Sequence, residues 1–346
     1  MNLFKIYRNF FYILQPETAH NLTILLLKNK LIFARKNCNN KILESNVAGI
    51  KFKNPVGLAA GFDKNAEAVN SLAKFNFGFL EFGTVTPKPQ PGNPKPRLFR
   101  LTKDRAIINR MGFNNVGSHI FMKNINNSNY KNITFGINIG KNKDSKDGFA
   151  DYYKLLDFFG DLPAYFTVNI SSPNTKGLRD LQKKDLLENF IKKLKKSYRT
   201  KIFLKIAPDL TDKELKDICN LSLKYSIDAL IISNTTISRD FSLYEKKKNE
   251  IGGLSGKPLY ELSNKKITFA YKILRGKVPI IGSGGILSSD DAYKKIKSGA
   301  NLIQLYSGLI YEGFYLANRI NKDLLKFLKR DGYKNISEAV GKNVKL

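Results

Sequence analysis

Eight short apolar runs recur along the chain from residue 47 onward, and each ends in small or polar residues before a helix-like stretch follows. The runs are almost continuously hydrophobic, which is typical of parallel strands buried on both faces. Strands that alternate with helices in this way favour a closed (β/α)8 barrel, or TIM barrel, over an open sheet. The eight runs are Val56–Ala59, Phe79–Gly83, Thr134–Ile139, Tyr165–Ile170, Ile202–Ile206, Ala229–Ile232, Val278–Ile281 and Leu302–Leu305.

The segments around these runs complete the expected organisation. Residues 43–53 precede the first strand and read as a small lid or hairpin, and Ser288 with Asp291 resembles a capping box that opens the last helix. No linker rich in Pro, Gly and Ser divides the barrel. We therefore expect one α/β catalytic domain, residues 41–346, behind an N-terminal helical extension, residues 1–40. The expected helices are Ala66–Phe75, Asp151–Phe159, Lys184–Tyr198, Asp212–Tyr225, Glu261–Leu274 and Asp290–Lys297.

The extension contains two basic amphipathic segments. Apolar residues recur at helical spacing up to Leu14, but Lys5 and Arg8 interrupt them, which argues against a signal peptide. The second segment, His20–Phe33, carries leucines beside Lys28 and neighbouring basic residues. Such helices lie on membrane surfaces in some proteins and simply cap a domain in others, so periodicity alone leaves both interpretations open. No run approaches the ~20 apolar residues of a membrane span.

The charge balance is strongly basic. The chain has 59 Lys and Arg residues against 29 Asp and Glu, a net charge of +30, which favours anionic partners. Lys and Asn are abundant throughout, as in composition-biased genomes, so the excess alone identifies no partner. The sequence offers no helix-turn-helix, zinc finger or aromatic-basic stacking motif, and we expect no specific binding to nucleic acid.

Cysteine and histidine are scarce. Cys38 and Cys219 are too few and too far apart for a disulfide framework or a metal cluster, and they fit a reducing, cytosol-facing compartment. With only His20 and His119, a multi-histidine metal site is nearly excluded, so we expect no metal.

The ends of the expected strands gather amides, lysines, hydroxyls and glycines on the face where TIM barrels carry their chemistry. Gly282–Gly285 and Tyr306–Gly308 follow the last two strands and form the pattern of a phosphate cradle. Leu287 stands where a Rossmann fingerprint has its third glycine, and no P-loop spacing occurs. The pattern therefore favours a cofactor with one phosphate, such as flavin mononucleotide (FMN).

Polar residues on this rim indicate a planar heterocyclic substrate. Asparagines both donate and accept hydrogen bonds without charge, as such a ring requires. Lys64 and Lys205 could neutralise a carboxylate or a reduced flavin. Ser172 lies in a segment without histidine or acidic residues, so a Ser-His-Asp hydrolase is not supported, but a serine can accept a proton that the substrate makes acidic. The four asparagines are Asn109, Asn169, Asn174 and Asn234.

At these residues the chain resembles the dihydroorotate dehydrogenases, specifically the membrane-associated, quinone-dependent class. The matching motifs are specific in combination and extend over nearly the whole length. They are Gln15–His20, Asn54–Lys64, Gly83–Gly92, Asn109–Asn114, Asn138–Asn142, Asn169–Gly177, Lys205–Asp209, Asn234–Thr236, Gly252–Leu259 and Gly282–Ile286.

The resemblance implies oxidation of dihydroorotate to orotate in pyrimidine synthesis, with one FMN per chain as hydride acceptor and ubiquinone as final electron acceptor. It implies that Ser172 is the catalytic base, where the soluble class has cysteine, and that residues 175–182 form a lid. The implied substrate contacts are Lys64, Asn109, Arg110, Met111, Gly112, Phe113, Asn169, Asn174, Asn234 and Thr235. The implied FMN contacts are Ala60, Gly61, Phe62, Asp63, Lys64, Thr84, Asn138, Asn169, Lys205, Ser233, Gly256, Gly285, Tyr306 and Ser307.

For the extension, the resemblance implies an apolar tunnel that leads ubiquinone to the flavin, with His20, Arg100 and Tyr306 near it. It favours the membrane-surface interpretation: peripheral binding to anionic lipid on the cytoplasmic side of a bacterial inner membrane. Ser233 stands where many members have threonine, and Lys176 where several have proline or alanine. The soluble class, linked to fumarate or NAD, is the alternative within the family, and activity without residues 1–40 would favour it.

Overall fold

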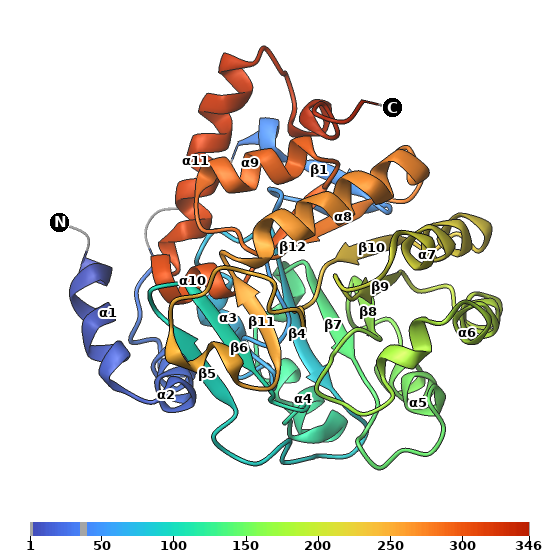
Figure 1. Ribbon diagram of the computed structural model, residues 1–346, viewed down its shortest axis with the longest axis horizontal. Coiled ribbons are helices and arrows are strands. Elements are labelled where there is room, and N and C mark those ends of the chain that lie inside the picture. The colour runs from blue at the N-terminus through green and yellow to red at the C-terminus, as the bar shows by residue number, and fades with distance from the viewer. Residues whose placement is uncertain (1–2, 35–39, 346) are drawn as a thin grey trace.

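Eight parallel strands close into a barrel at the centre of the computed structural model, which describes residues 3–34 and 40–345 (Figure 1). Each of the eight predicted runs supplies one strand, and neighbours around the barrel follow one another in sequence. The predicted (β/α)8 barrel is therefore confirmed. Its strands are β3 (Val56–Leu58), β4 (Phe79–Val85), β7 (Phe135–Ile139), β8 (Tyr165–Asn169), β9 (Ile202–Ile206), β10 (Ala229–Ile232), β12 (Ile280–Ser283) and β13 (Leu302–Leu305).

All six predicted helices form around the barrel, and the first is much shorter than expected. Ala66 has a φ of 56°, outside the helical region, so α3 covers only Val69–Leu72. The others are α5 (Ala150–Phe159), α6 (Lys184–Ser197), α7 (Asp212–Lys224), α8 (Leu259–Leu274) and α9 (Ser289–Lys297). Three further helices were not predicted: α4 (Gly117–Asn126), α10 (Ser307–Glu312) and α11 (Tyr315–Arg330).

The segment expected to be a lid or hairpin is a hairpin, and it closes the end of the barrel opposite the polar rim. Strands β1 (Ser45–Val47) and β2 (Ile50–Phe52) pair antiparallel across a turn with positive φ at Ala48 and Gly49. The hairpin packs Val47 and Phe52 against a cluster that includes Phe79, at the start of β4. Of the two expected forms, a lid or a hairpin, the segment therefore adopts the hairpin.

A small antiparallel sheet, absent from our predictions, lies in front of the barrel (Figure 1). It pairs β5 (Leu98–Leu101) with β6 (Ala106–Asn109), and β6 with β11 (Gly253–Gly256). It thereby brings the end of β6, at Asn109, next to a segment about 140 residues later in the chain. Short 3-10 helices are η1 (Lys41–Leu43), η2 (Tyr130–Asn132), η3 (Arg179–Gln182), η4 (Lys246–Asn249) and η5 (Ile336–Ala339).

The N-terminal extension forms two helices, α1 (Leu3–Ile13) and α2 (Pro16–Lys28), at one side of the barrel (Figure 1). Arg100 fixes the end of α1 by donating a hydrogen bond to the Tyr12 carbonyl at 3.1 Å. Large apolar side chains remain exposed on the pair, with Ile13 at 84% and Leu25 at 54%. No helix within residues 3–34 or 40–345 has the length and apolar character needed to cross a bilayer. Residues 35–39, which include Cys38, lie outside the described residues.

Candidate active site

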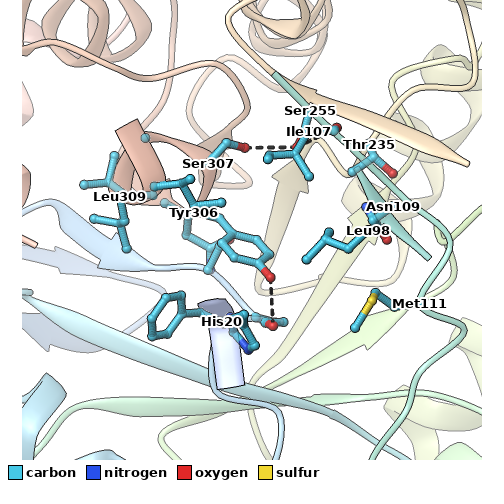
Figure 2. A pocket seen from close by; sticks show the side chains of 18 of the residues that line it. His20, Leu98, Ile107, Asn109, Met111, Thr235, Ser255, Tyr306, Ser307 and Leu309 are labelled. Atoms are coloured by element: carbon cyan, nitrogen blue, oxygen red, sulfur yellow. Dashed lines mark hydrogen bonds between the residues drawn. The ribbon is translucent and has the colours of Figure 1, made fainter. Parts of the chain in front are cut away.

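One cavity of about 820 Å³ begins at the carboxyl ends of the barrel strands and continues between α1, α2 and the barrel. Its volume lies within the ~300–1,000 Å³ typical of small-molecule sites. Figure 2 shows side chains from both parts facing it, with His20 beside Tyr306 and with Asn109 and Thr235 across from them. The predicted site residues that line it are His20, Ala60, Gly61, Phe62, Lys64, Thr84, Arg100, Asn109, Met111, Gly112, Phe113, Asn169, Ser172, Asn174, Lys205, Ser233, Asn234, Thr235, Gly285, Tyr306 and Ser307.

Ser172 and two asparagines form one polar wall of the cavity. Ser172 is buried, and its Oγ accepts a hydrogen bond from the Asn174 amide N–H at 3.3 Å. Asn174 Nδ2 donates to Asn109 Oδ1 at 3.2 Å, which joins the segment after β8 to the end of β6. The wall therefore places a hydroxyl and two amides around one space, as a planar ring with alternating donors and acceptors requires.

A buried carboxylate lies beneath this wall, in the barrel interior. Glu81 accepts hydrogen bonds from Asn138 Nδ2 at 2.8 Å, from Gln304 Nε2 at 2.6 Å and from the Tyr165 hydroxyl at 3.3 Å. Glu81 and Tyr165 are fully buried. Because the carboxylate only accepts hydrogen bonds, it fixes Asn138 with its amide nitrogen toward Glu81 and its oxygen toward the rim.

That orientation is passed on to the rim asparagines. Asn138 Oδ1 accepts from Thr84 Oγ1 at 2.5 Å and from Asn169 Nδ2 at 3.1 Å. Asn169 Oδ1 is thereby turned toward Ser171 Oγ, which donates to it at 2.9 Å, and Asn234 Nδ2 donates to Ser171 Oγ, also at 2.9 Å. One carboxylate thus sets the direction of three side-chain amides in succession, those of Asn138, Asn169 and Asn234.

Two lysines bring positive charge to the cavity, and both lose hydration because they are buried. Burial lowers the pKa of Lys205, while the charge of Glu81 acts in the opposite direction. Burial also lowers the pKa of Lys64, to about 8; the charge of Glu17 raises it, and that of Arg97 lowers it. An anionic ligand would therefore stabilise the charged form of both lysines, because it replaces the water that burial removed.

The glycine-rich turn after β12 is shaped for close approach of a ligand to the backbone. Gly284 and Gly285 have φ values of 113° and 73°, and a Cβ on Gly285 would stand 2.5–2.7 Å from Tyr260. Within the described residues, the amide N–H groups of both glycines have no hydrogen-bond acceptor, and both residues line the cavity. Free amides in such a turn form a nest that suits a phosphate.

The opposite half of the cavity is apolar and aromatic. The His20 ring meets the Phe62 ring edge to face at a centroid distance of 5.5 Å, and Phe62 meets Tyr306 at 6.0 Å. Burial and the charge of Lys64 lower the pKa of His20 to about 3, so the imidazole is neutral at physiological pH. The Tyr306 hydroxyl donates to the Gly61 carbonyl at 3.1 Å (Figure 2), and burial raises its pKa to about 12.

The segment predicted to be a lid, residues 175–182, is tied to the barrel by Arg179 and by Gln182, whose Oε1 accepts from the Ala207 N–H at 2.9 Å. Arg179, at the start of η3, donates to the Ser171 carbonyl at 3.0 Å and to the Thr235 carbonyl at 2.9 Å, and it pairs with Asp209 at 2.7 Å. The arginine therefore connects the segments after β8, β9 and β10.

Four predicted site residues do not line the cavity. Asp63 caps the backbone N–H groups of residues 67 and 68, and burial raises its pKa to about 6. Asn138 lies one layer deeper, beside Glu81. Arg110 turns outward to pair with Glu250 at 2.7 Å. Gly256 allows close packing between strands, since a Cβ there would stand 2.3 Å from a backbone oxygen of the β5–β6 turn.

Several contributors were missed from the sequence: Glu81, Gln304, Glu17 and Arg97. Glu81 carried a signal, because a charged residue within a strand buried on both faces needs a partner inside the barrel. Glu17 lies in the matching motif Gln15–His20, but nothing in the sequence indicated its pairing with Arg97, since 80 residues separate them. Within the described residues, no group of three His, Cys, Asp or Glu side chains could hold a metal ion.

Comparison with known proteins agrees with this geometry. Residues 42–328 match the family of dihydroorotate dehydrogenases. The chain is 45% identical to the dihydroorotate dehydrogenase (quinone) of Parvibaculum lavamentivorans over 348 residues, covering 100% of both chains. It is 49% identical to the enzyme of the same name from Bartonella henselae, covering 97% of this chain and 95% of that protein.

A solved structure supports the same assignment. The ligand-free dihydroorotate dehydrogenase of Eimeria tenella superposes with a TM-score of 0.91 at 41% identity, covering 96% of this chain and 100% of the other. Fold and sequence thus agree over nearly the whole chain. The chain belongs to the dihydroorotate dehydrogenase family, in its quinone-dependent class.

Proposed function

We propose that this quinone-dependent dihydroorotate dehydrogenase oxidises (S)-dihydroorotate to orotate with FMN as hydride acceptor and ubiquinone as final electron acceptor, in the synthesis of pyrimidine nucleotides. The observation that carries the proposal is a single cavity with a polar wall of serine and asparagines at one end and an apolar mouth formed by α1 and α2 at the other. Such a cavity can hold a polar heterocycle and a lipophilic oxidant on either side of one cofactor.

The residues present fit an FMN. The free amides of Gly284 and Gly285 suit its phosphate, and the positive φ values keep that turn clear of side chains. Lys205 and the amide of Asn169, which Asn138 orients from below, offer one cation and hydrogen-bonding groups to a flavin ring. An FMN held there would supply a hydride acceptor for the substrate and an electron donor for the quinone.

We assign the base to Ser172. Its Oγ faces the cavity and accepts the Asn174 N–H, which stabilises negative charge that develops on the oxygen during proton transfer. Asn109, Asn174 and Asn234 orient the pyrimidine ring, and Lys64 balances the substrate carboxylate. The segment held by Arg179 excludes water from this wall while the proton moves.

The quinone enters between the two N-terminal helices and the barrel, past His20, Arg100 and Tyr306. The exposed apolar side chains of Ile13 and Leu25 support peripheral binding of residues 1–40 to an anionic membrane surface, on the cytoplasmic side of a bacterial inner membrane. Lys28 adds an exposed cation beside them, although it also pairs with Glu67 at 3.5 Å. Residues 41–346 form the catalytic domain, and the proposal includes no specific nucleic-acid partner.

The visible spectrum of the purified protein tests the proposal. We expect flavin absorbance that bleaches when dihydroorotate is added and returns with a soluble quinone, but not with fumarate or NAD. Ser172→Ala should nearly abolish bleaching while the flavin stays bound, because the base is removed without touching the cofactor wall. A colourless protein that takes up no FMN would refute the cofactor assignment, and undiminished bleaching in the variant would remove Ser172 from the mechanism.

A further inference from the structure

An ion pair between a half-buried glutamate and a buried arginine joins the N-terminal extension to the barrel domain. Glu17, in the first turn of α2, accepts hydrogen bonds from Arg97 Nη2 at 2.7 Å and from Arg97 Nε at 3.1 and 3.2 Å to its two oxygens. The Arg97 side chain is only 7% exposed. Burial raises the pKa of Glu17, but the hydrogen bond and charge of Arg97 outweigh it and hold that pKa below its usual value. The pair is therefore ionised and bidentate.

The remaining N–H groups of the Arg97 guanidinium bind the loop that precedes β5. Its Nη1 donates to the Pro91 carbonyl at 2.6 Å and to the Asn93 carbonyl at 2.8 Å. The guanidinium thus has acceptors on both sides, one set on α2 and one on the loop. Because the N–H directions of the planar guanidinium are fixed relative to one another, the position of Glu17 on α2 constrains the position of the loop carbonyls.

Asn93 continues the connection to the polar wall of the cavity. Its side-chain amide donates to the Arg110 carbonyl at 2.9 Å and to the Asn174 carbonyl at 3.2 Å, and its backbone N–H donates to the Met111 carbonyl at 3.0 Å. These carbonyls belong to the two segments whose side chains, Asn109 and Asn174, bind each other across the wall. The path from Glu17 to the wall therefore consists of hydrogen bonds between buried or half-buried groups.

We infer that Glu17 is a positioning residue for the dihydroorotate site: through Arg97 and Asn93 it sets the geometry of Asn109 and Asn174, so that docking of helix α2 and affinity for the pyrimidine ligand are coupled. The inference rests on the proposed substrate site. It gives the extension a role in the half-reaction that does not involve quinone.

Orotate binding to the oxidised holoenzyme tests the coupling without turnover. Glu17→Gln keeps the shape of the side chain but leaves Arg97 without its anion. We expect the orotate dissociation constant, measured from the change in flavin absorbance, to rise about tenfold, within the usual range for linked sites. The KM for dihydroorotate in anaerobic flavin reduction should rise in parallel, with a smaller change in the limiting rate.

A matched control separates coupling from loose docking of the helix. Ser71 Oγ donates to the Leu27 carbonyl at 2.5 Å, so Ser71→Ala weakens the far end of α2 without touching Arg97. It should leave orotate affinity unchanged. The double variant Glu17→Gln, Asn93→Ala should lose no more affinity than Asn93→Ala alone, because both changes interrupt one path.

An unpaired buried arginine could also prevent folding. Glu17→Gln with Arg97→Met removes the charge together with its partner, and it should show the same loss of orotate affinity. The inference is overturned if this variant or Glu17→Gln binds orotate as the wild type does. It is also overturned if Ser71→Ala loses as much orotate affinity as Glu17→Gln, or if the losses in Glu17→Gln and Asn93→Ala add in the double variant. A wild-type protein whose flavin neither binds orotate nor is reduced by dihydroorotate would instead refute the proposed function.

Discussion

Glu81→Gln is the substitution that most directly tests how the barrel interior organises the active site. The carboxylate has two oxygens, and three donors point at them. Glutamine presents one oxygen and one NH2 group of nearly the same shape. If the new oxygen keeps the bond from Gln304, the new NH2 faces the Asn138 nitrogen, and two donors oppose each other in a buried space.

The magnitude follows from the bonds that are lost. A hydrogen bond to a charged group contributes about 1.5–3 kcal/mol, and a buried donor left without acceptor costs about 1–3 kcal/mol. Asn138 can escape by rotating its amide, but its nitrogen then faces the Asn169 nitrogen, which moves the conflict to the rim. Lys205 loses the carboxylate that raises its pKa, so its charged form is destabilised further. We therefore expect Glu81→Gln to destabilise the hydrogen-bonded network of the site by a total of about 3 kcal/mol.

The assay compares FMN and orotate affinity in the two proteins. Even half of this free energy, about 1.5 kcal/mol, corresponds to roughly tenfold in a dissociation constant. Fluorescence of released FMN on dilution gives the first constant, and the flavin absorbance change with orotate gives the second. Both should weaken in Glu81→Gln by about tenfold or more.

Thr167→Val is the matched control, because Thr167 lies in the same barrel interior with a buried hydroxyl that has no hydrogen-bond partner. Removing that hydroxyl should leave both affinities unchanged. The reasoning fails if Glu81→Gln binds FMN and orotate as the wild type does, or if Thr167→Val loses as much affinity as Glu81→Gln.

Three further predictions test the wall, the lid and the turn after β12. Lys64, with a pKa of about 8, is charged below that pH and neutral above it, so orotate affinity should fall as the pH rises through about 8; Lys64→Met should show a flat profile over the same range. Arg179→Ala removes the arginine's bonds to the Ser171 and Thr235 carbonyls and should raise the KM for dihydroorotate roughly tenfold, with faster hydrogen exchange in residues 175–182; an unchanged exchange rate would contradict this role. Gly285→Ala should lower FMN affinity at least about tenfold because its Cβ meets helix α8. Gly276→Ala, with a similar φ but open space around it and no place in the cavity, should keep wild-type FMN affinity, and equal losses in the two variants would show that general destabilisation, not the clash, is responsible.

Local features of the sequence were sufficient for the barrel strands and for most of the rim. Parallel strands buried on both faces require unbroken apolar runs, and the residues at their carboxyl ends must meet on one face, so Ser172, Lys205 and Asn234 could be grouped without coordinates. The resemblance to the family then supplied roles for these positions. It also included Arg110, whose side chain points away from the cavity to Glu250, and Gly256, which serves close packing between strands.

By itself, therefore, the sequence determined the strand order of the barrel, the polar rim and the amphipathic character of the first helix, because each depends on periodicity or on position along one strand. Only the tertiary structure decided that residues 43–53 close the far end of the barrel, that Glu81 orients the rim amides, and that Glu17 meets Arg97. Those relations join groups far apart in the chain. Their energies depend on distance, burial and hydrogen-bond direction, which no local pattern of residues records.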